Sequence, residues 1–368
     1  MDVNPSTQKY AGGALWSPLP VLRERVRVRV FRLDRERLRL FPLILLALTL
    51  IAAPHALAVP PLPQDKRIPA QVTAHLAAPT TQPMRMPNAV AVDSKGNVWV
   101  ADGGQDRIVR FGPDGHFDRA FTSIGSEKLN RPVGMKVDAA DRLWIADTGN
   151  HRLLIAGADG QLAEQITLPA APSGRACDPT DVALTPDGKR CYIIDMDNQR
   201  ALIRDNASGQ FKSMGEGGKA LGQFEWPFMI CVGDQDYVYI TEAIGARVQM
   251  ISPADRWAGA IGSWGVELGK LYRPKGIAID RNGKVYVSDS TLNVVQVFSS
   301  RGAIEGALTD AAGNLLRFQH PMGLCFDKAG RLYVVELSAD RVAIVTIGGA
   351  AAAPAPPAPP AGGARRTL

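Results

Sequence analysis

Short runs of apolar, β-forming residues follow one another between residues 87 and 347, each bounded by Asp, Asn, Gly or Ser. Runs of four to six such residues predict strands, and the turn-forming residues between them predict hairpins. In the stretch that begins at residue 274, hairpin turns are expected at 280–283 and 299–302, where Asn, Ser and Gly suit tight turns. No helical periodicity of useful length interrupts the pattern, so the chain is predicted to be all-β.

A proline opens this pattern six times, at spacings of 45 to 48 residues. A fixed period of this length, built from short strands, predicts a radial array of four-stranded antiparallel sheets. After residue 347 the last unit gives way to a low-complexity tail, which offers no fourth strand. We therefore expect an N-terminal strand at 67–75 to complete it and close a six-bladed β-propeller, because closure removes exposed strand edges. The first strands of the units are expected at 88–93, 133–138, 180–185, 228–233, 275–280 and 322–327.

An acidic residue ends the second strand of every unit, and an arginine follows five residues later in five of the six units. We expect each acid to pair with its arginine and to fix the turn between them, because charge-assisted hydrogen bonds are strong and directional. In the fifth unit Val294 replaces the arginine. Asp289 then either pairs with Arg273 or Lys275, or reaches into the mouth of the central channel. The five complete pairs are Asp102–Arg107, Asp147–Arg152, Asp195–Arg200, Glu242–Arg247 and Glu336–Arg341.

The segment 147–153, Asp-Thr-Gly-Asn-His-Arg-Leu, with Pro-Val-Gly at 132–134, resembles the NHL repeat family. The resemblance extends over residues 67–349 and implies a six-bladed propeller. In the related peptidyl-hydroxyglycine lyase, histidines directly after the repeat prolines hold a zinc ion. No histidine stands at the matching positions here, and a catalytic zinc of that type needs three imidazoles. The resemblance therefore disfavours this zinc lyase activity.

The loops before the prolines and the turns after the second strands are expected on one face of the ring, here called the proline-loop face. Aromatic and cationic side chains gather there, and such residues form the energetic centres of protein interfaces. We expect a monomeric propeller that binds a protein or peptide through this face, with no assigned catalytic residue and no cofactor. The expected binding residues are Arg131, Trp226, Phe228, Tyr272, Arg273, Lys275, Asp289 and His320.

An enzyme is the alternative: a small-molecule lyase or a hydrolase of the lactonase type, acting at the channel mouth. Calcium prefers oxygen ligands. In this alternative the ion is bound by oxygen atoms from Asn88, Asp178, Asp181 and Asp289.

The formal net charge of +6 is concentrated at the two ends of the chain. Residues 1–58 carry nine basic and four acidic side chains, and the tail adds two arginines, which leaves 31 basic and 32 acidic residues elsewhere. Binding to nucleic acid requires a local cationic surface, so no nucleic-acid partner is expected.

A basic leader, an apolar run at 41–53 and Ala-Leu-Ala at 56–58 have the features of a secretory signal peptide. Cleavage after Ala58 predicts an exported protein, periplasmic or secreted, without stable membrane insertion; otherwise the segment remains as an uncleaved anchor. Residues 59–66 form a Pro-rich lead-in, 67–349 the propeller, and 350–368 a disordered Ala/Pro-rich tail.

Two of the four cysteines occupy equivalent repeat positions: Cys231 and Cys325 each stand four residues after a proline. Alanine fills that position in three other units, so a small buried side chain is expected. Cys177 and Cys191 share one unit, and the sequence leaves open whether they form a disulfide.

Overall fold

The computed structural model describes residues 62–233 and 235–348. These residues form β-strands and four 3-10 turns, η2 (Gln64–Lys66), η3 (Gly103–Gln105), η4 (Thr148–Asn150) and η5 (Leu337–Ala339). No helix in this part of the chain is long and apolar enough to cross a membrane. The proposed signal peptide and the Ala/Pro-rich tail lie outside the described residues.

Six four-stranded antiparallel units make up the fold, and the inner strand of each begins at a repeat proline. The first blade is β2 (Pro87–Val92), β3 (Val98–Asp102), β4 (Arg107–Phe111) and β5 (Phe117–Phe121). The second is β8 (Pro132–Val137), β9 (Leu143–Asp147), β10 (Arg152–Ala156) and β11 (Leu162–Thr167). The third is β12 (Pro179–Leu184), β13 (Arg190–Asp195), β14 (Arg200–Asp205) and β15 (Phe211–Met214).

The fourth blade is β18 (Pro227–Val232), β19 (Val238–Glu242), β20 (Arg247–Ile251) and β21 (Trp257–Ile261). The fifth is β22 (Pro274–Ile279), β23 (Val285–Asp289), β24 (Val294–Phe298) and β25 (Ile304–Thr309). The sixth is β26 (Pro321–Phe326), β27 (Leu332–Glu336), β28 (Arg341–Ile347) and β1 (Arg67–Leu76). Two small ribbons, β6 (Ser123–Ile124) with β7 (Glu127–Lys128) and β16 (Glu216–Gly217) with β17 (Gln223–Phe224), lie between blades in the chain.

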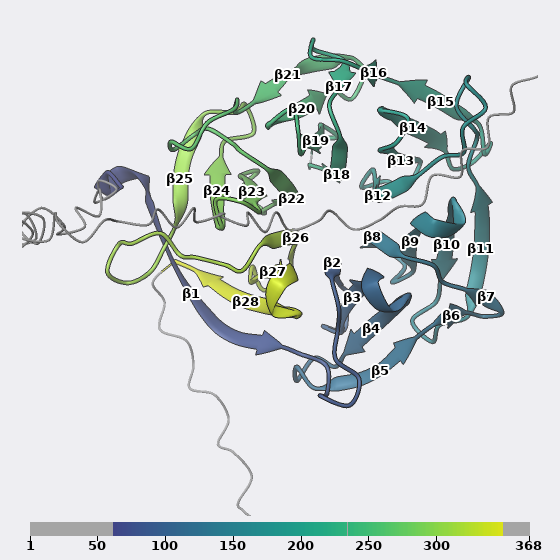
Figure 1. Cartoon of the computed structure of the whole chain (residues 1–368), viewed down its shortest axis with the longest axis horizontal. Coiled ribbons are helices and arrows are strands. Elements are labelled where there is room, and N and C mark those ends of the chain that lie inside the picture. The colour runs from purple at the N-terminus through teal and green to yellow at the C-terminus, as the bar shows by residue number, and fades with distance from the viewer. Residues whose placement is uncertain (1–61, 234, 349–368) are drawn as a thin grey trace, which may run out of the picture. The chain divides into compact units, whose positions relative to one another are not determined.

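The inner strands follow one another around a common centre, as Figure 1 shows. β2 contacts β8, β8 contacts β12, β12 contacts β18, β18 contacts β22, β22 contacts β26, and β26 contacts β2. This cycle returns to its starting strand, so the blades form a closed β-propeller. The all-β prediction and the propeller arrangement are confirmed.

Strand β1 closes the ring by pairing with two blades. Its residues 70–76 pair antiparallel with β28, and its residues 67–69 pair parallel with β25 of the fifth blade. The fifth and sixth blades therefore share one eight-stranded sheet. Gly306 in β25 permits this approach, because a Cβ at that position would collide with the carbonyl oxygen of Lys66.

The proline–x–glycine sequence has a packing explanation in the same structure. A Cβ on Gly276 would collide with the carbonyl oxygen of Met322 in the next blade, and a Cβ on Gly134 would collide with Asp181. Glycine therefore lets adjacent inner strands come close together near the proline, where the ring is narrow. The core lies between the blades and includes the fully buried Trp99 and Tyr333.

Candidate functional site

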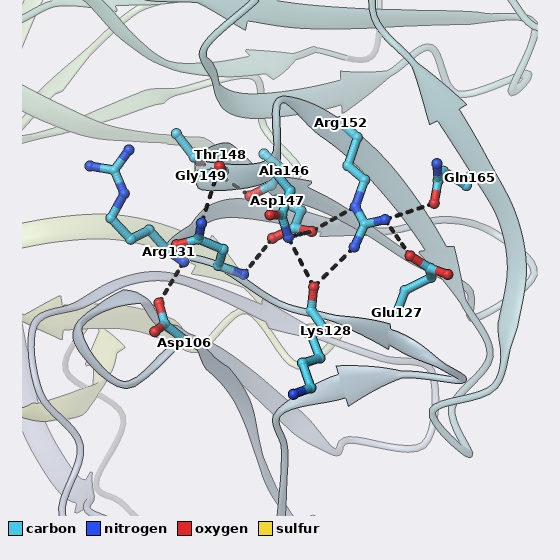
Figure 2. Close-up of polar contacts among 12 residues, drawn as sticks. Asp106, Glu127, Lys128, Arg131, Ala146, Asp147, Thr148, Gly149, Arg152 and Gln165 are labelled. Carbon is cyan, nitrogen blue, oxygen red and sulfur yellow. Dashed lines mark hydrogen bonds and ion pairs between the residues drawn. The ribbon is translucent and has the colours of Figure 1, made fainter.

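The second blade carries the most complete version of the acid–arginine turn (Figure 2). Asp147 is fully buried and accepts a hydrogen bond from Nε of Arg152 at 2.9 Å. The side-chain amide of Asn150 donates to the same oxygen, Oδ2, and the other oxygen, Oδ1, accepts the backbone N–H of Asn130 at 2.8 Å. The carboxylate thus ties the proline loop to the turn after the second strand.

All five acid–arginine ion pairs are present, with Nε–oxygen distances of 2.6 to 2.9 Å. In each case the acid also accepts a backbone N–H from the loop just before the proline of its own blade. These five acids therefore have a structural role: they hold the proline loops at defined positions.

Asp289 does not reach the channel mouth. Its side chain is fully buried and accepts backbone N–H groups from Tyr272 at 2.6 Å and from Arg273, Thr291 and Leu292 at 3.0 to 3.1 Å. It forms no ion pair with Arg273 or Lys275 within the described structure. Both expectations for this residue are corrected, because four backbone amides replace the missing arginine.

Four side chains connect neighbouring blades on the proline-loop face. Each accepts the backbone N–H of the residue before the next repeat proline, at 2.7 to 3.0 Å, and in each pair both residues have a positive φ. At the other two junctions the acceptor positions hold His151 and Ala246, and the residues before proline, Asp178 and Arg273, lack a positive φ. The four acceptor–donor pairs are Asp106–Arg131 (Figure 2), Gln199–Trp226, Asn293–His320 and Asp340–Met86.

The aromatic and cationic residues predicted for binding divide into an exposed group and a buried group. Trp226 is 44% exposed, whereas Phe228 is only 8% exposed and belongs to the hydrophobic core. Nζ of Lys275 lies 3.9 Å from the centre of the Phe228 ring, and burial together with the charge of Arg273 lowers the pKa of Lys275 to about 8. Phe228 is therefore corrected from an exposed anchor to a buried one.

A second cluster joins Tyr272 and Arg273 to a residue that the sequence analysis missed. The Arg273 guanidinium lies 5.2 Å from the Tyr272 ring centre, and the Tyr272 ring lies 5.9 Å from that of Trp264. Trp264 is 66% exposed. The sequence signal for Trp264 is an aromatic residue in the loop that leads to a repeat proline, at a distance from the proline and not beside it. Arg131 and His320 are exposed on other blades and do not join this cluster.

Exposed large apolar side chains are confined to one face of the described propeller. All six lie in loops before a proline or in a turn after a second strand, which places them on the proline-loop face. Five of the six belong to the loops of the fourth blade or to the loop leading into the fifth. They are Met86, Leu221, Trp226, Ile244, Trp264 and Val266.

The opposite face, formed by the turns after the first strands, contains a cavity of about 500 Å³. Lys136 lines it, with Cys231 and Cys325 from blades four and six. Lys136 stands four residues after its proline, where the other blades carry alanine or cysteine. This charged exception in a row of small residues is the sequence signal for Lys136.

The four oxygen donors considered for calcium do not converge. Asp181 uses Oδ2 to accept the backbone N–H of Ile230 at 3.0 Å, Asp289 is enclosed by amides, and the amide of Asn88 donates to the carbonyl oxygen of Met86. Within residues 62–233 and 235–348, no three His, Cys, Asp or Glu side chains are grouped as metal ligands. Cys177 and Cys191 are buried free thiols.

Fold comparison places the chain among the β-propellers. It resembles a streptogramin B lyase (13% identity, TM-score 0.56, covering 76% of this chain and 98% of that one). It also resembles a gluconolactonase from Xanthomonas campestris (15%, 0.56, 76% and 95%) and an auxiliary nutrient binding protein from Bacteroides thetaiotaomicron (11%, 0.55, 75% and 73%). No curated protein matches the sequence.

The NHL repeat family model matches residues 129–155, which contain the second-blade turn of Figure 2. The chain is therefore a β-propeller with one segment that matches the NHL repeat, in agreement with the sequence resemblance. At these levels of identity, the structural similarity establishes the fold alone.

Proposed function

We propose that this propeller is a binding platform for a protein or peptide, and that it binds its partner at the loops of blades four and five on the proline-loop face. The observation that carries the proposal is the one-sided distribution of exposed apolar side chains. A soluble surface seldom gathers such residues on one face without an interaction to bury them.

The composition of this surface supports the same proposal. Trp226 and Trp264 are large and exposed, and Tyr272 and Arg273 lie in contact beside Trp264. Tryptophan, tyrosine and arginine are the residues most enriched at the energetic centres of interfaces. The hydrogen bond from Trp226 to Gln199 fixes the backbone of its loop, which reduces the entropy that binding would cost.

The enzyme alternative has less support from geometry. The fold neighbours include a lyase and a gluconolactonase, but also a nutrient binding protein. The acid proposed for a channel-mouth site, Asp289, is buried beneath backbone amides. The proposed binding role, by contrast, requires no catalytic group and uses only the exposed proline-loop surface.

Selection of displayed peptides on the full-length protein tests the proposal. We expect apolar peptides with acidic residues to be enriched, and the double variant Trp226→Ala/Trp264→Ala to weaken their binding at least tenfold in calorimetric titrations. Met86→Ala is the matched control, because Met86 is 60% exposed on the same face but belongs to the first blade. Selected peptides that bind the double variant and the parent equally would refute the proposed surface.

Export is part of the same proposal, with a monomeric propeller released by cleavage after Ala58 and without a nucleic-acid partner. Sequencing the N-terminus of the protein recovered from the cell envelope tests it. A first residue at Val59 is expected, and a chain that keeps its original N-terminus would favour the anchored form.

A further inference from the structure

A second site lies on the face opposite the proposed docking surface. Blades two to five each contribute two consecutive inner-strand residues to the wall of the 500 Å³ cavity, and blade six contributes three. The volume lies within the size range of ligand-binding pockets. The outer ring of this wall is apolar and half-buried, and consists of Val137, Leu184, Val232, Ile279 and Phe326. The inner ring consists of Lys136, Ala183, Cys231, Ala278 and Cys325.

Lys136 is the one charged member of these two rings. It is half-buried, and its ammonium group forms no hydrogen bond or ion pair with any residue of 62–233 or 235–348. A lysine removed from water is costly unless an anion compensates its charge. Burial is the largest influence and disfavours the charged form, whereas the Asp181 carboxylate, with Cys325 and Cys231, favours it; the net effect raises the pKa of Lys136, so the group is cationic at neutral pH.

Asp181 cannot serve as a direct partner of Lys136 in this geometry. It is 4% exposed, does not line the cavity, and uses Oδ2 to accept the backbone N–H of Ile230. The carboxylate acts on the lysine over a longer range, so the donor hydrogens of the ammonium remain available to a ligand.

The other polar groups around the cavity are neutral or already paired. Burial raises the pKa of both channel thiols, to about 12 for Cys231, so they carry no charge. At the rim, Arg142 donates to Asp138 at 2.7 Å, and Asp187 accepts hydrogen bonds from Thr185 and Lys189. The cavity therefore presents one available cation inside an apolar wall.

We propose that this cavity binds one small organic carboxylate, with its carboxylate on the ammonium of Lys136 and its apolar body against the ring of Val137, Leu184, Val232, Ile279 and Phe326. A charge-assisted hydrogen bond in a partly dry site gives the orientation, and apolar burial gives most of the affinity. This site is separate from the proline-loop surface and does not depend on its function.

Calorimetric titration of the full-length protein with matched pairs of ligands provides the test. Benzoate and octanoate are compared with benzyl alcohol and octanol, which keep the apolar body and lose the charge. We expect one carboxylate per chain and at least tenfold weaker binding of the alcohols, since a hydrogen bond between two charged groups is stronger than one to a neutral hydroxyl. Equal affinity for acid and alcohol, or no binding of either acid at millimolar concentration, would overturn the proposal.

Variants separate the site from non-specific binding. Lys136→Met, which keeps the length of the side chain, should weaken carboxylate binding at least tenfold, and Lys136→Arg should largely retain it. Lys275→Met is the matched control, because it removes the lysine that follows the fifth proline, near the opposite end of the channel, and should leave binding unchanged. The proposal fails if Lys275→Met abolishes binding or if Lys136→Met leaves it intact.

Two further variants keep the proposal testable if Lys136→Met does not fold. Ala183→Leu fills the inner ring without touching the lysine and should also abolish binding. The Trp226→Ala/Trp264→Ala variant should bind carboxylates normally, which distinguishes failure of this site from failure of the proposed platform.

Discussion

The backbone N–H of Trp226 donates a hydrogen bond of 2.7 Å to Oε1 of Gln199, a residue of the preceding blade. Both residues have a positive φ, and Nε2 of Gln199 donates to the carbonyl oxygen of Met196, which fixes the orientation of the amide. A side chain of the third blade therefore holds the most prominent aromatic residue of the fourth.

Replacing Gln199 with alanine should remove this connection. We expect the free energy of unfolding to fall by about 1 kcal/mol, the typical value of one hydrogen bond, and platform binding to weaken because Trp226 is less well ordered. Urea denaturation measures the first effect. Gln161→Ala, an exposed glutamine whose side chain makes no hydrogen bond in the described structure, should stay within about 0.5 kcal/mol of the parent. Equal stability of both variants would contradict this prediction.

Removing a buried arginine should be much more costly than removing an exposed one. Arg200 pairs with the fully buried Asp195, and its side chain is only 7% exposed, so Arg200→Ala should cost about 3–5 kcal/mol. Arg142 makes an equally short pair with Asp138 but is 47% exposed, so Arg142→Ala should cost less than about 1 kcal/mol. Urea denaturation of both variants measures the two changes in the free energy of unfolding. Similar decreases for both would show that burial does not control the cost.

Asp181 predicts a specific pH dependence of stability. Burial raises its pKa from 3.8 to about 6, and the charge of Lys136 and the amides of Ile230 and Val182 limit the rise. Between pH 4 and 6 the folded state then binds more protons at this group than the unfolded state. The free energy of unfolding should therefore fall as pH rises through this window, by up to about 3 kcal/mol from this group.

The variant Asp181→Asn isolates that contribution, because the amide oxygen can still accept the N–H of Ile230. Subtracting its unfolding free energy from that of the parent at each pH removes the effect of the other titrating groups. The difference should change steadily between pH 4 and 6 and level off outside it. Parallel curves across this range would contradict the assignment.

Lys275 should react with amine reagents at an unusually low pH. Its pKa of about 8 makes about half of the amine neutral at pH 8, whereas an ordinary lysine is then neutral in well under 1% of molecules. Peptide mapping after brief acetylation should give a modification rate for Lys275 with its midpoint near pH 8. N-acetyl-lysine is the reference, and a Lys275 profile that follows the reference would refute the lowered pKa.

The positions of the blades were predictable because proline has a defined role at the start of an inner strand. It lacks an N–H group, and the edge of the inner strand that faces the channel needs no donor there. Each of the six inner strands accordingly begins at its proline, and the arginine positions mark the starts of the third strands. Spacing alone was sufficient for these features.

The directions of the inner-strand side chains were not predictable, because the pairing register shifts immediately after every proline. A bulge changes which face each following residue occupies, so simple alternation fails there. Phe228 was therefore assigned to the surface although it is buried, and the place of Lys136 in the cavity was missed. Asp289 was misjudged because the amides that surround it come from a loop without a strand pattern.

The pairing of β1 with β25 and β28 sets the order in which the molecule can be completed. During synthesis this strand emerges before every other strand of the propeller, yet its partners are made more than two hundred residues later. Until then the sixth blade has no outer strand and the first-made segment has nothing to bind. Two nascent copies held close together at that stage could exchange these segments. The strand pairing that closes the ring of one molecule is therefore also the site at which two molecules can form a domain-swapped dimer.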